Sequence, residues 1–185
     1  ENVTVTLTSD DPTEGTVTSP AGPLTFTPGN YADPQPVTVT GQPDDIDDDN
    51  QGFNIDIESA SGDTNYSGLV DSVGITNIDD DTAGVTVVET PPMQTTEAGG
   101  TAGFTVALSS EPTATVTVTL TSSDPTEGVV TTPAGPLTFT TGNWETAQLV
   151  TITGQPDDLV DGNIGYNIIL NPSGDTVYNG LANVS

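Results

Sequence analysis

The chain has 185 residues, of which 27 are Asp or Glu and none is Lys, Arg or His, so its formal net charge is −27. Nucleic-acid binding requires Lys or Arg, while Ser-His and Cys-His nucleophile pairs, imidazole or thiolate metal sites and disulfides require His or Cys, so this composition excludes all of them. The oxygen ligands that remain favour a hard cation, above all calcium, and the alternative is an acidic coat that only keeps the chain soluble.

Apolar and polar residues alternate along the chain with the period of two that is typical of β-strands. In the first half, this alternation predicts strands at 3–9, 36–41, 52–57 and 73–78. In the second half, it predicts strands near 84–90, 102–109, 114–122, 127–132, 136–140, 148–154 and 164–170. Helical periodicity is absent, and Gly, Pro, Asn and Asp separate the strands. The sequence therefore predicts an all-β protein of antiparallel sheets.

The chain repeats itself at an offset of 113 residues. The segment Val3–Ser9 returns as Val116–Ser122, and Pro20–Thr27 returns as Pro133–Thr140. A period of this length matches one whole sandwich-sized domain and is too long for a solenoid repeat.

We therefore expect tandem immunoglobulin-like β-sandwiches in two incomplete copies. The expected domains are residues 1–81, without the N-terminal strands, and residues 82–185, without the last strand. Matching aromatic positions, Phe26 with Phe139 and Phe53 with Tyr166, are expected to face the core. Tyr31 and Trp144 also match and follow a Gly-Asn turn, where they are expected to be partly exposed.

The acidic residues are not evenly spread. Residues 1–81 hold 17 of the 27, including five between Asp44 and Asp49 and the run Asp79–Asp81. Unit charges about 5 Å apart repel by roughly 0.8 kcal/mol in bulk water, so such clusters are expected to be ordered only with bound cations. Because alternate strand ends meet at one pole of a sandwich, the loops that carry these acids are expected to converge. An EF-hand does not fit, because Asn50 replaces the required Gly and the flanking elements are strands.

Five acidic positions recur in both copies and are the candidate ligands from this comparison. They are Asp11/Asp124, Glu14/Glu127, Asp44/Asp157, Asp45/Asp158 and Asp48/Asp161. The other acids of the first copy are expected to provide general acidity or to hold an additional ion.

Several motifs resemble the Calx-β domain. They are Thr96–Thr101, Thr121–Asp124, Pro136–Asn143, Pro156–Asp158 and the run Asn77–Asp81. The resemblance covers essentially the whole chain as two incomplete copies. It implies a seven-stranded sandwich that binds Ca²⁺ at one tip. The ligands it implies are Asp11, Asp44, Asp45, Asp48, Asp79, Asp80 and Asp81 in the first copy, and Glu97, Asp124, Asp157, Asp158 and Asp161 in the second.

The function predicted from these features is a calcium-rigidified spacer repeat of a long extracellular adhesin or surface fibre. Its expected partners are calcium and neighbouring repeats of the same chain. The alternatives are a module that recognises a glycan or other surface, and a filament subunit completed by strands of like chains. An enzyme is not expected, because tandem repetition favours architecture. No apolar run approaches the roughly 18 to 20 residues of a membrane span and the first residues do not resemble a signal peptide, so no membrane insertion is expected within this segment.

Overall fold

The structure is a computed structural model that describes residues 1–179 and 181. The described residues form thirteen strands and no helix, which confirms the expected all-β fold. The chain divides into two compact units. The first comprises residues 1–44 and 48–80, and the second comprises residues 45–47 together with the chain from residue 81 onwards.

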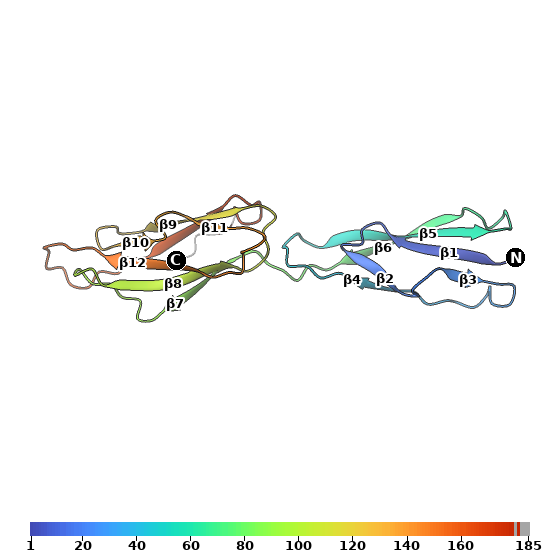
Figure 1. The fold of residues 1–185 in the computed structure, drawn as a ribbon, viewed down its shortest axis with the longest axis horizontal. Helices are drawn as coiled ribbons and strands as arrows, with labels where there is room; N and C mark the ends of the chain where they lie inside the picture. Colours follow the sequence, from blue (N-terminus) through green and yellow to red (C-terminus); the bar gives the residue numbers. More distant parts are fainter. Residues whose placement is uncertain (180, 182–185) are drawn as a thin grey trace. The chain divides into compact units, whose positions relative to one another are not determined.

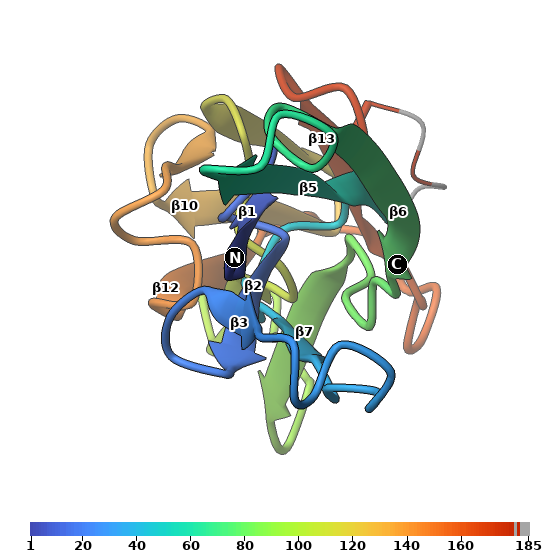
Figure 2. The same ribbon diagram turned by 90° about the vertical axis from the view of Figure 1, so that its right-hand side faces the viewer.

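The first unit contains six strands in two antiparallel sheets (Figure 1). Its strands are β1 (Val3–Ser9), β2 (Gly15–Ser19), β3 (Leu24–Phe26), β4 (Thr38–Gly41), β5 (Gln51–Ser61) and β6 (Val70–Asn77). One sheet has the order β3-β1-β5-β6, and β2 pairs with β4 in the other. Strand β5 therefore lies between β1 and β6, as Figure 2 also shows.

The inner face of β5 supplies the buried apolar residues of the first unit. Phe53 and Ile55 are each only 3% exposed, and they lie opposite Ile75 and Val73 of β6. Residues directly opposite in an antiparallel pair share one face of the sheet. This face therefore continues from β5 onto β6.

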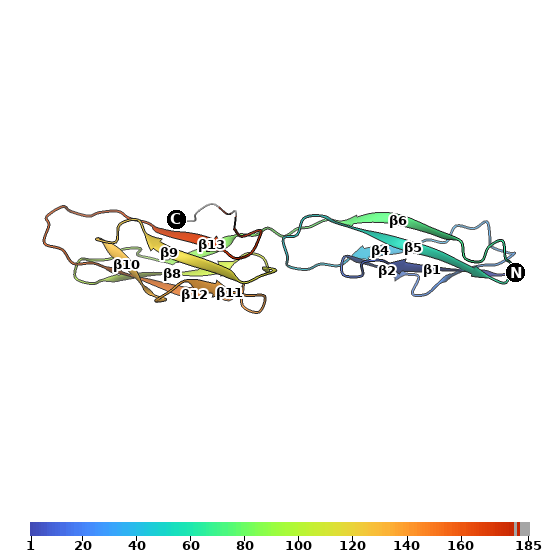
Figure 3. The ribbon, with the colours of Figure 1, turned by 90° about the horizontal axis from the view of Figure 1, so that it is seen from above.

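The second unit contains seven strands in two antiparallel sheets (Figure 3). They are β7 (Val85–Thr90), β8 (Thr101–Leu108), β9 (Val116–Ser122), β10 (Gly128–Thr132), β11 (Leu137–Phe139), β12 (Gln148–Gly154) and β13 (Ile168–Ser173). Their orders are β10-β12-β8-β7 and β11-β9-β13.

Alternate residues of the second unit's strands form one apolar core between its two sheets. Along β8, Phe104, Val106 and Leu108 are buried while the residues between them are half-buried. Phe139 is fully buried, as expected from its place in the repeat, and Trp144 is half-buried against the same core. Burying a side chain such as Phe139 contributes about 1.5–3 kcal/mol.

One expected strand begins later than predicted. The sequence predicted a strand at 164–170, whereas β13 is Ile168–Ser173. In the first unit, the matching residues Gln51–Asn54 pair with Asn77–Gly74 of β6. Among the residues that the structure describes, no strand pairs with residues 164–167, and a strand needs a partner for its backbone hydrogen bonds.

A buried polar pair closes one end of the second unit. The hydroxyl group of Tyr178 donates a hydrogen bond to the carbonyl oxygen of Ser110 at 2.7 Å, and Tyr178 is fully buried. The carboxylate of Asp175 accepts hydrogen bonds from the hydroxyl group of Thr113 and the amide of Ala114, each at 2.9 Å. These contacts fix the chain between β8 and β9 against the loop that follows β13.

Candidate metal centre

The turn after β9 carries the first two acids of the candidate centre. Asp124 accepts a hydrogen bond from the amide of Thr126 at 3.1 Å, and its carbonyl oxygen accepts one from the amide of Gly128 at 3.2 Å. Such a turn is typical of an Asp side chain that bonds to the backbone two residues further on. The turn leads the chain into β10, so Glu127 lies directly before that strand. The hydrogen bonds from the side chain and backbone of Thr126 lower the pKa of Asp124.

The loop after β12 brings two further acids to Glu127. The amide of Gln155 donates a hydrogen bond to the carbonyl oxygen of Glu127 at 2.9 Å, which holds this loop against the turn. Carboxylate oxygens of Glu127, Asp157 and Asp161 all lie within 4.8 Å of one another. Gly162 follows with φ at +83°, a conformation that glycine adopts without strain and that allows the sharp change of direction there.

The electrostatics of this cluster favour a cation. Burial raises the pKa of Glu127, and the charges of Asp161, Asp157, Asp124 and Glu97 raise it further, in that order. No Lys, Arg or His is present in the chain to offset them. Carboxylate oxygens are ligands that calcium prefers, so the donor set fits this ion.

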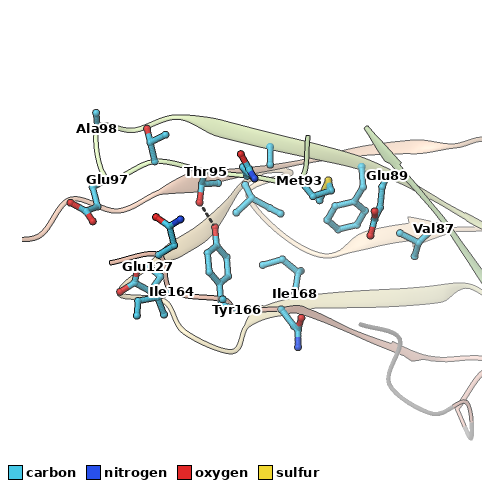
Figure 4. A pocket seen from close by; sticks show the side chains of 18 of the residues that line it. Val87, Glu89, Met93, Thr95, Glu97, Ala98, Glu127, Ile164, Tyr166 and Ile168 are labelled. Carbon is cyan, nitrogen blue, oxygen red and sulfur yellow. Dashed lines mark hydrogen bonds between the residues drawn. The ribbon is translucent and has the colours of Figure 1, made fainter. Parts of the chain in front are cut away.

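Four of the five ligands expected in the second copy therefore surround Glu127. Asp157 and Asp161 are members of the cluster, and Asp124 and Glu97 are close enough to shift its pKa. Figure 4 shows Glu97 and Glu127 on opposite sides of one end of a groove. Asp158 is exposed and is not a member of the cluster.

Glu127 is the central residue that the implied ligand set left out. It was among the five acids that recur in both copies, but the resemblance did not include it. The signal was available in the sequence, because Glu127 follows Asp124 by three residues, as Glu14 follows Asp11. Only the structure places its carboxylate next to Asp157 and Asp161.

In the first unit, the end of β6 meets the turn that carries Glu14. The side-chain amide of Asn77 donates hydrogen bonds to Glu14 Oε2 at 3.3 Å and to the carbonyl oxygen of Gln42 at 2.9 Å. Just beyond β6, the carboxylate of Asp79 accepts a hydrogen bond from the amide of Asp49 at 3.0 Å. The loop before β5 and the acidic run after β6 therefore lie together, as expected.

The other ligands expected in the first copy are more dispersed. Asp11 accepts a hydrogen bond from the amide of Thr13 at 3.1 Å, and the carbonyl oxygen of Asp48 accepts one from the side chain of Gln51. Asp45 is part of the second unit, where its carbonyl oxygen accepts a hydrogen bond from the amide of Glu111 at 2.6 Å. Within residues 1–179 and 181, the only group of three or more acids with oxygens this close is the one at Glu127, so Asp44, Asp79, Asp80 and Asp81 form no such group.

Comparison with known proteins identifies the family. A model of the Calx-beta domain matches residues 1–78 and 79–179. No curated protein and no solved structure matches the chain. Calx-beta domains are non-catalytic modules that bind calcium and are usually extracellular. Within the described part of the chain, no helix has the length and apolar character needed to span a membrane. The chain thus belongs to the Calx-beta family, as two tandem domains.

Proposed function

We propose that this chain is a calcium-rigidified spacer of a long extracellular adhesin or surface fibre. The observation that carries the proposal is the cluster of Glu127, Asp157 and Asp161 in a chain without a single basic side chain. Repetition in tandem supports a structural role rather than a catalytic one. A spacer must hold its form under load, and a bound ion would supply that stiffness by removing the repulsion between carboxylates that the two loops bring together.

The proposed centre would hold calcium through residues of two loops. Glu127 and Asp124 come from the turn between β9 and β10, whereas Asp157 and Asp161 come from the loop after β12. Calcium takes six to eight oxygen ligands, so these carboxylates would be completed by backbone oxygens or water. The ion would replace repulsion between the loops with attraction and so hold the two loops together.

A related centre is proposed for the first copy. Its residues in the first unit are the turn acids Asp11 and Glu14, the loop acids Asp44 and Asp48, and Asp79 and Asp80 after β6. Asp79 already contacts the amide of Asp49, which supports the participation of the run after β6. Because this run leads into the second copy, an ion held there would restrict the chain between the domains.

The test compares the whole chain in excess calcium and in chelator. Calorimetric titration should detect saturable calcium binding, and the midpoint of thermal unfolding should rise in calcium. The rotational correlation time from NMR relaxation should approach that of one rigid body in calcium and fall in chelator. Magnesium at the same ionic strength is the control, because it favours a smaller octahedral site. Identical unfolding and rotational diffusion in calcium and chelator would refute the spacer.

A further inference from the structure

The loop between β12 and β13 carries the one Asp-Gly sequence of the chain. Asp161 is followed directly by Gly162, and no other Asp in the sequence precedes a glycine. Residues 155–167, which include this pair, form no strand, and both members of the pair are exposed. The pair therefore lies in irregular backbone that water reaches.

The loop has the same character in the first unit. The counterpart residues 42–50 form no strand either, and Asp48, the counterpart of Asp161, is also exposed. In that unit, β5 is paired with β6. The exposure of Asp161 therefore belongs to the loop itself and does not depend on whether a strand pairs with β13.

The two copies differ at the residue that follows this Asp. Gly162 has φ at 83° and its counterpart Asp49 has φ at 64°, so both positions adopt the left-handed conformation. A Cβ atom added to Gly162 would meet nothing within 4 Å. The first copy thus carries a side chain where the second copy has open space beside the backbone.

An exposed Asp-Gly pair can rearrange without an enzyme. The backbone amide nitrogen of the glycine attacks Cγ of the aspartic acid, a bond forms between these two atoms, and the amide proton leaves with the acid hydroxyl group as water. Water then reopens the resulting five-membered succinimide ring at either of its carbonyl carbons. Glycine favours ring closure because it has no Cβ to hinder the approach of its nitrogen.

We propose that the bond between Asp161 and Gly162 rearranges to isoaspartate, and that this removes the Asp161 carboxylate from the acidic cluster. Ring opening at the α-carbonyl carbon breaks the original peptide bond, so the chain then runs through Cβ and Cγ of residue 161. The free carboxylate is attached directly to Cα, and the backbone is one atom longer. Mass and net charge are unchanged, and only the positions of the oxygen atoms differ.

Other aspartates of the chain are less suited to this reaction. Asp71 precedes Ser72, which is also small, but both residues lie in β6 and pair with β5. Asp157 precedes a larger residue, and its carboxylate accepts a hydrogen bond from the amide of Leu159 at 2.7 Å. Asp161 combines an exposed side chain, irregular backbone and a following glycine.

The rearrangement would act on the candidate metal centre. Carboxylate oxygens of Asp161, Glu127 and Asp157 lie within 4.8 Å of one another. A carboxylate that is one bond closer to the backbone, on a chain that is one atom longer, does not keep this arrangement. A bound calcium ion would therefore lose one of its ligands. This consequence rests on the calcium centre proposed above, whereas the rearrangement itself does not.

Calcium should in turn protect the pair. An ion bound to Asp161 would hold its carboxylate among the oxygens of Glu127 and Asp157, and so restrain Cγ from reaching the amide nitrogen of Gly162. A chain without calcium would rearrange faster and would afterwards bind calcium less well. The amount of isoaspartate would therefore increase with the time that the chain spends without calcium.

The experiment follows residue 161 in the whole chain during long incubation at neutral pH. Chymotrypsin, which cleaves after Leu159 and Tyr166, releases a peptide in which Asp161 is the one acidic residue. Isoaspartate is distinguished from Asp in this peptide by electron-transfer fragmentation and by resistance to a protease that cleaves before Asp. In chelator, we expect isoaspartate to form at least tenfold faster at position 161 than at any other Asp. In calcium at the same ionic strength, its formation at 161 should be at least fivefold slower.

Two substitutions in the same loop test the cause. Gly162→Asn gives the residue after Asp161 a Cβ, and Asn adopts the left-handed conformation more readily than most residues. Gly165→Asn places the same side chain at another glycine with open space beside it and is the matched control. We expect isoaspartate formation to be at least tenfold slower in Gly162→Asn and unchanged in Gly165→Asn.

Calcium titrations before and after incubation in chelator measure the consequence. The fraction of second-unit sites that keep the original affinity should fall as the fraction of isoaspartate rises. Asp161→Glu keeps a carboxylate but closes a six-membered ring more slowly, so incubation should not change the affinity of this variant. An isoaspartyl methyltransferase with S-adenosylmethionine returns isoaspartate to the succinimide and should restore part of the lost binding.

Each contrary outcome overturns a stated part of the proposal. Isoaspartate that forms no faster at position 161 than at Asp48 refutes the rearrangement. Equal rates in calcium and chelator refute the protection, and unchanged calcium binding by chains that carry isoaspartate refutes the consequence. A fresh chain that binds no calcium refutes the proposed centre and its coupling to the rearrangement, whereas isoaspartate at position 161 in chelator would still establish the rearrangement.

Discussion

The side chain of Asn77 donates a hydrogen bond to Glu14 Oε2 at 3.3 Å. The two residues are 63 positions apart, and the contact joins the end of β6 to the turn before β2. A neutral amide is well suited to this place, because it donates to both Glu14 and the carbonyl oxygen of Gln42. It gives Glu14 a donor in a unit that has no cationic side chain.

Replacing Asn77 by Asp should make the first unit dependent on calcium. The variant loses both donated hydrogen bonds and places a second carboxylate against Glu14, where like charges at about 4 Å repel by about 1 kcal/mol in water and more where solvent is restricted. We expect faster hydrogen exchange along β6 in chelator and recovery of protection in calcium. Asn2→Asp adds the same charge at an exposed position and is the control. Equal exchange in Asn77→Asp and the unchanged chain would contradict this role.

Glu127→Gln should weaken calcium binding while stabilising the metal-free second unit. The substitution removes one carboxylate of the cluster and, in the absence of metal, relieves its repulsion with Asp157 and Asp161. Calorimetry should show at least a tenfold loss of affinity at one site. Unfolding of the second unit is followed by fluorescence of Trp144, which is the single tryptophan of the chain. Glu145→Gln is the matched control, since Glu145 is exposed and outside the cluster, and a similar loss there would count against the assignment.

The stability of the metal-free second unit should rise on mild acidification. The pKa of Glu127 is raised above its ordinary value of 4.5, so its contribution is favourable at low pH and is lost as the pH increases through the raised pKa. The pKa values of Asp124 and Asp175 are lowered from 3.8, so their contributions are lost in stronger acid. Urea unfolding followed through Trp144 should therefore show the greatest stability at a pH below the raised pKa of Glu127 and above the lowered pKa values of Asp124 and Asp175. Calcium should remove the gain on mild acidification, because it favours the charged form of Glu127. A metal-free stability that falls steadily from neutral pH would disprove this.

Asp175→Ala should destabilise the second unit by about 1–3 kcal/mol. The change removes the buried carboxylate that accepts partly buried hydrogen bonds from the amide of Ala114 and the hydroxyl group of Thr113. Burial raises the pKa of Asp175, but the hydrogen bonds from Thr113, Ala114 and Val177 outweigh it and lower the pKa overall. Urea unfolding followed by Trp144 fluorescence measures the loss.

The repeat provides the control for Asp175. Asp63 occupies the matching position in the first unit, where its carboxylate accepts hydrogen bonds from the amide and the side chain of the neighbouring Asn65. Asp63→Ala removes local bonds of a half-buried residue and should cost less. Equal losses of stability for the two variants would show that the contacts of Asp175 across the unit are not important.

Local pattern predicted most strands because alternation depends only on neighbours in the chain. Val3–Ser9 and Gln148–Gly154 were expected at nearly these bounds, and Thr between apolar residues marked the outer face. The strand near 164–170 was shifted because residues 164–167 need a partner strand that local pattern cannot supply. Asp175 and Tyr178 were not expected to be important, because their partners at Ser110, Thr113 and Ala114 are more than 60 residues away.

By itself, the sequence determined the chemistry available to this protein. A chain with 27 acids and no basic residue can offer a cation only oxygen ligands. The repeat at an offset of 113 residues determined that such ligands occur in two similar domains. Which acids meet was decided by the tertiary structure. Glu127, Asp157 and Asp161 come together because the turn after β9 and the loop after β12 are held to one another by a backbone hydrogen bond. Charge depends on composition alone, whereas the distance between charges depends on how the strands pair.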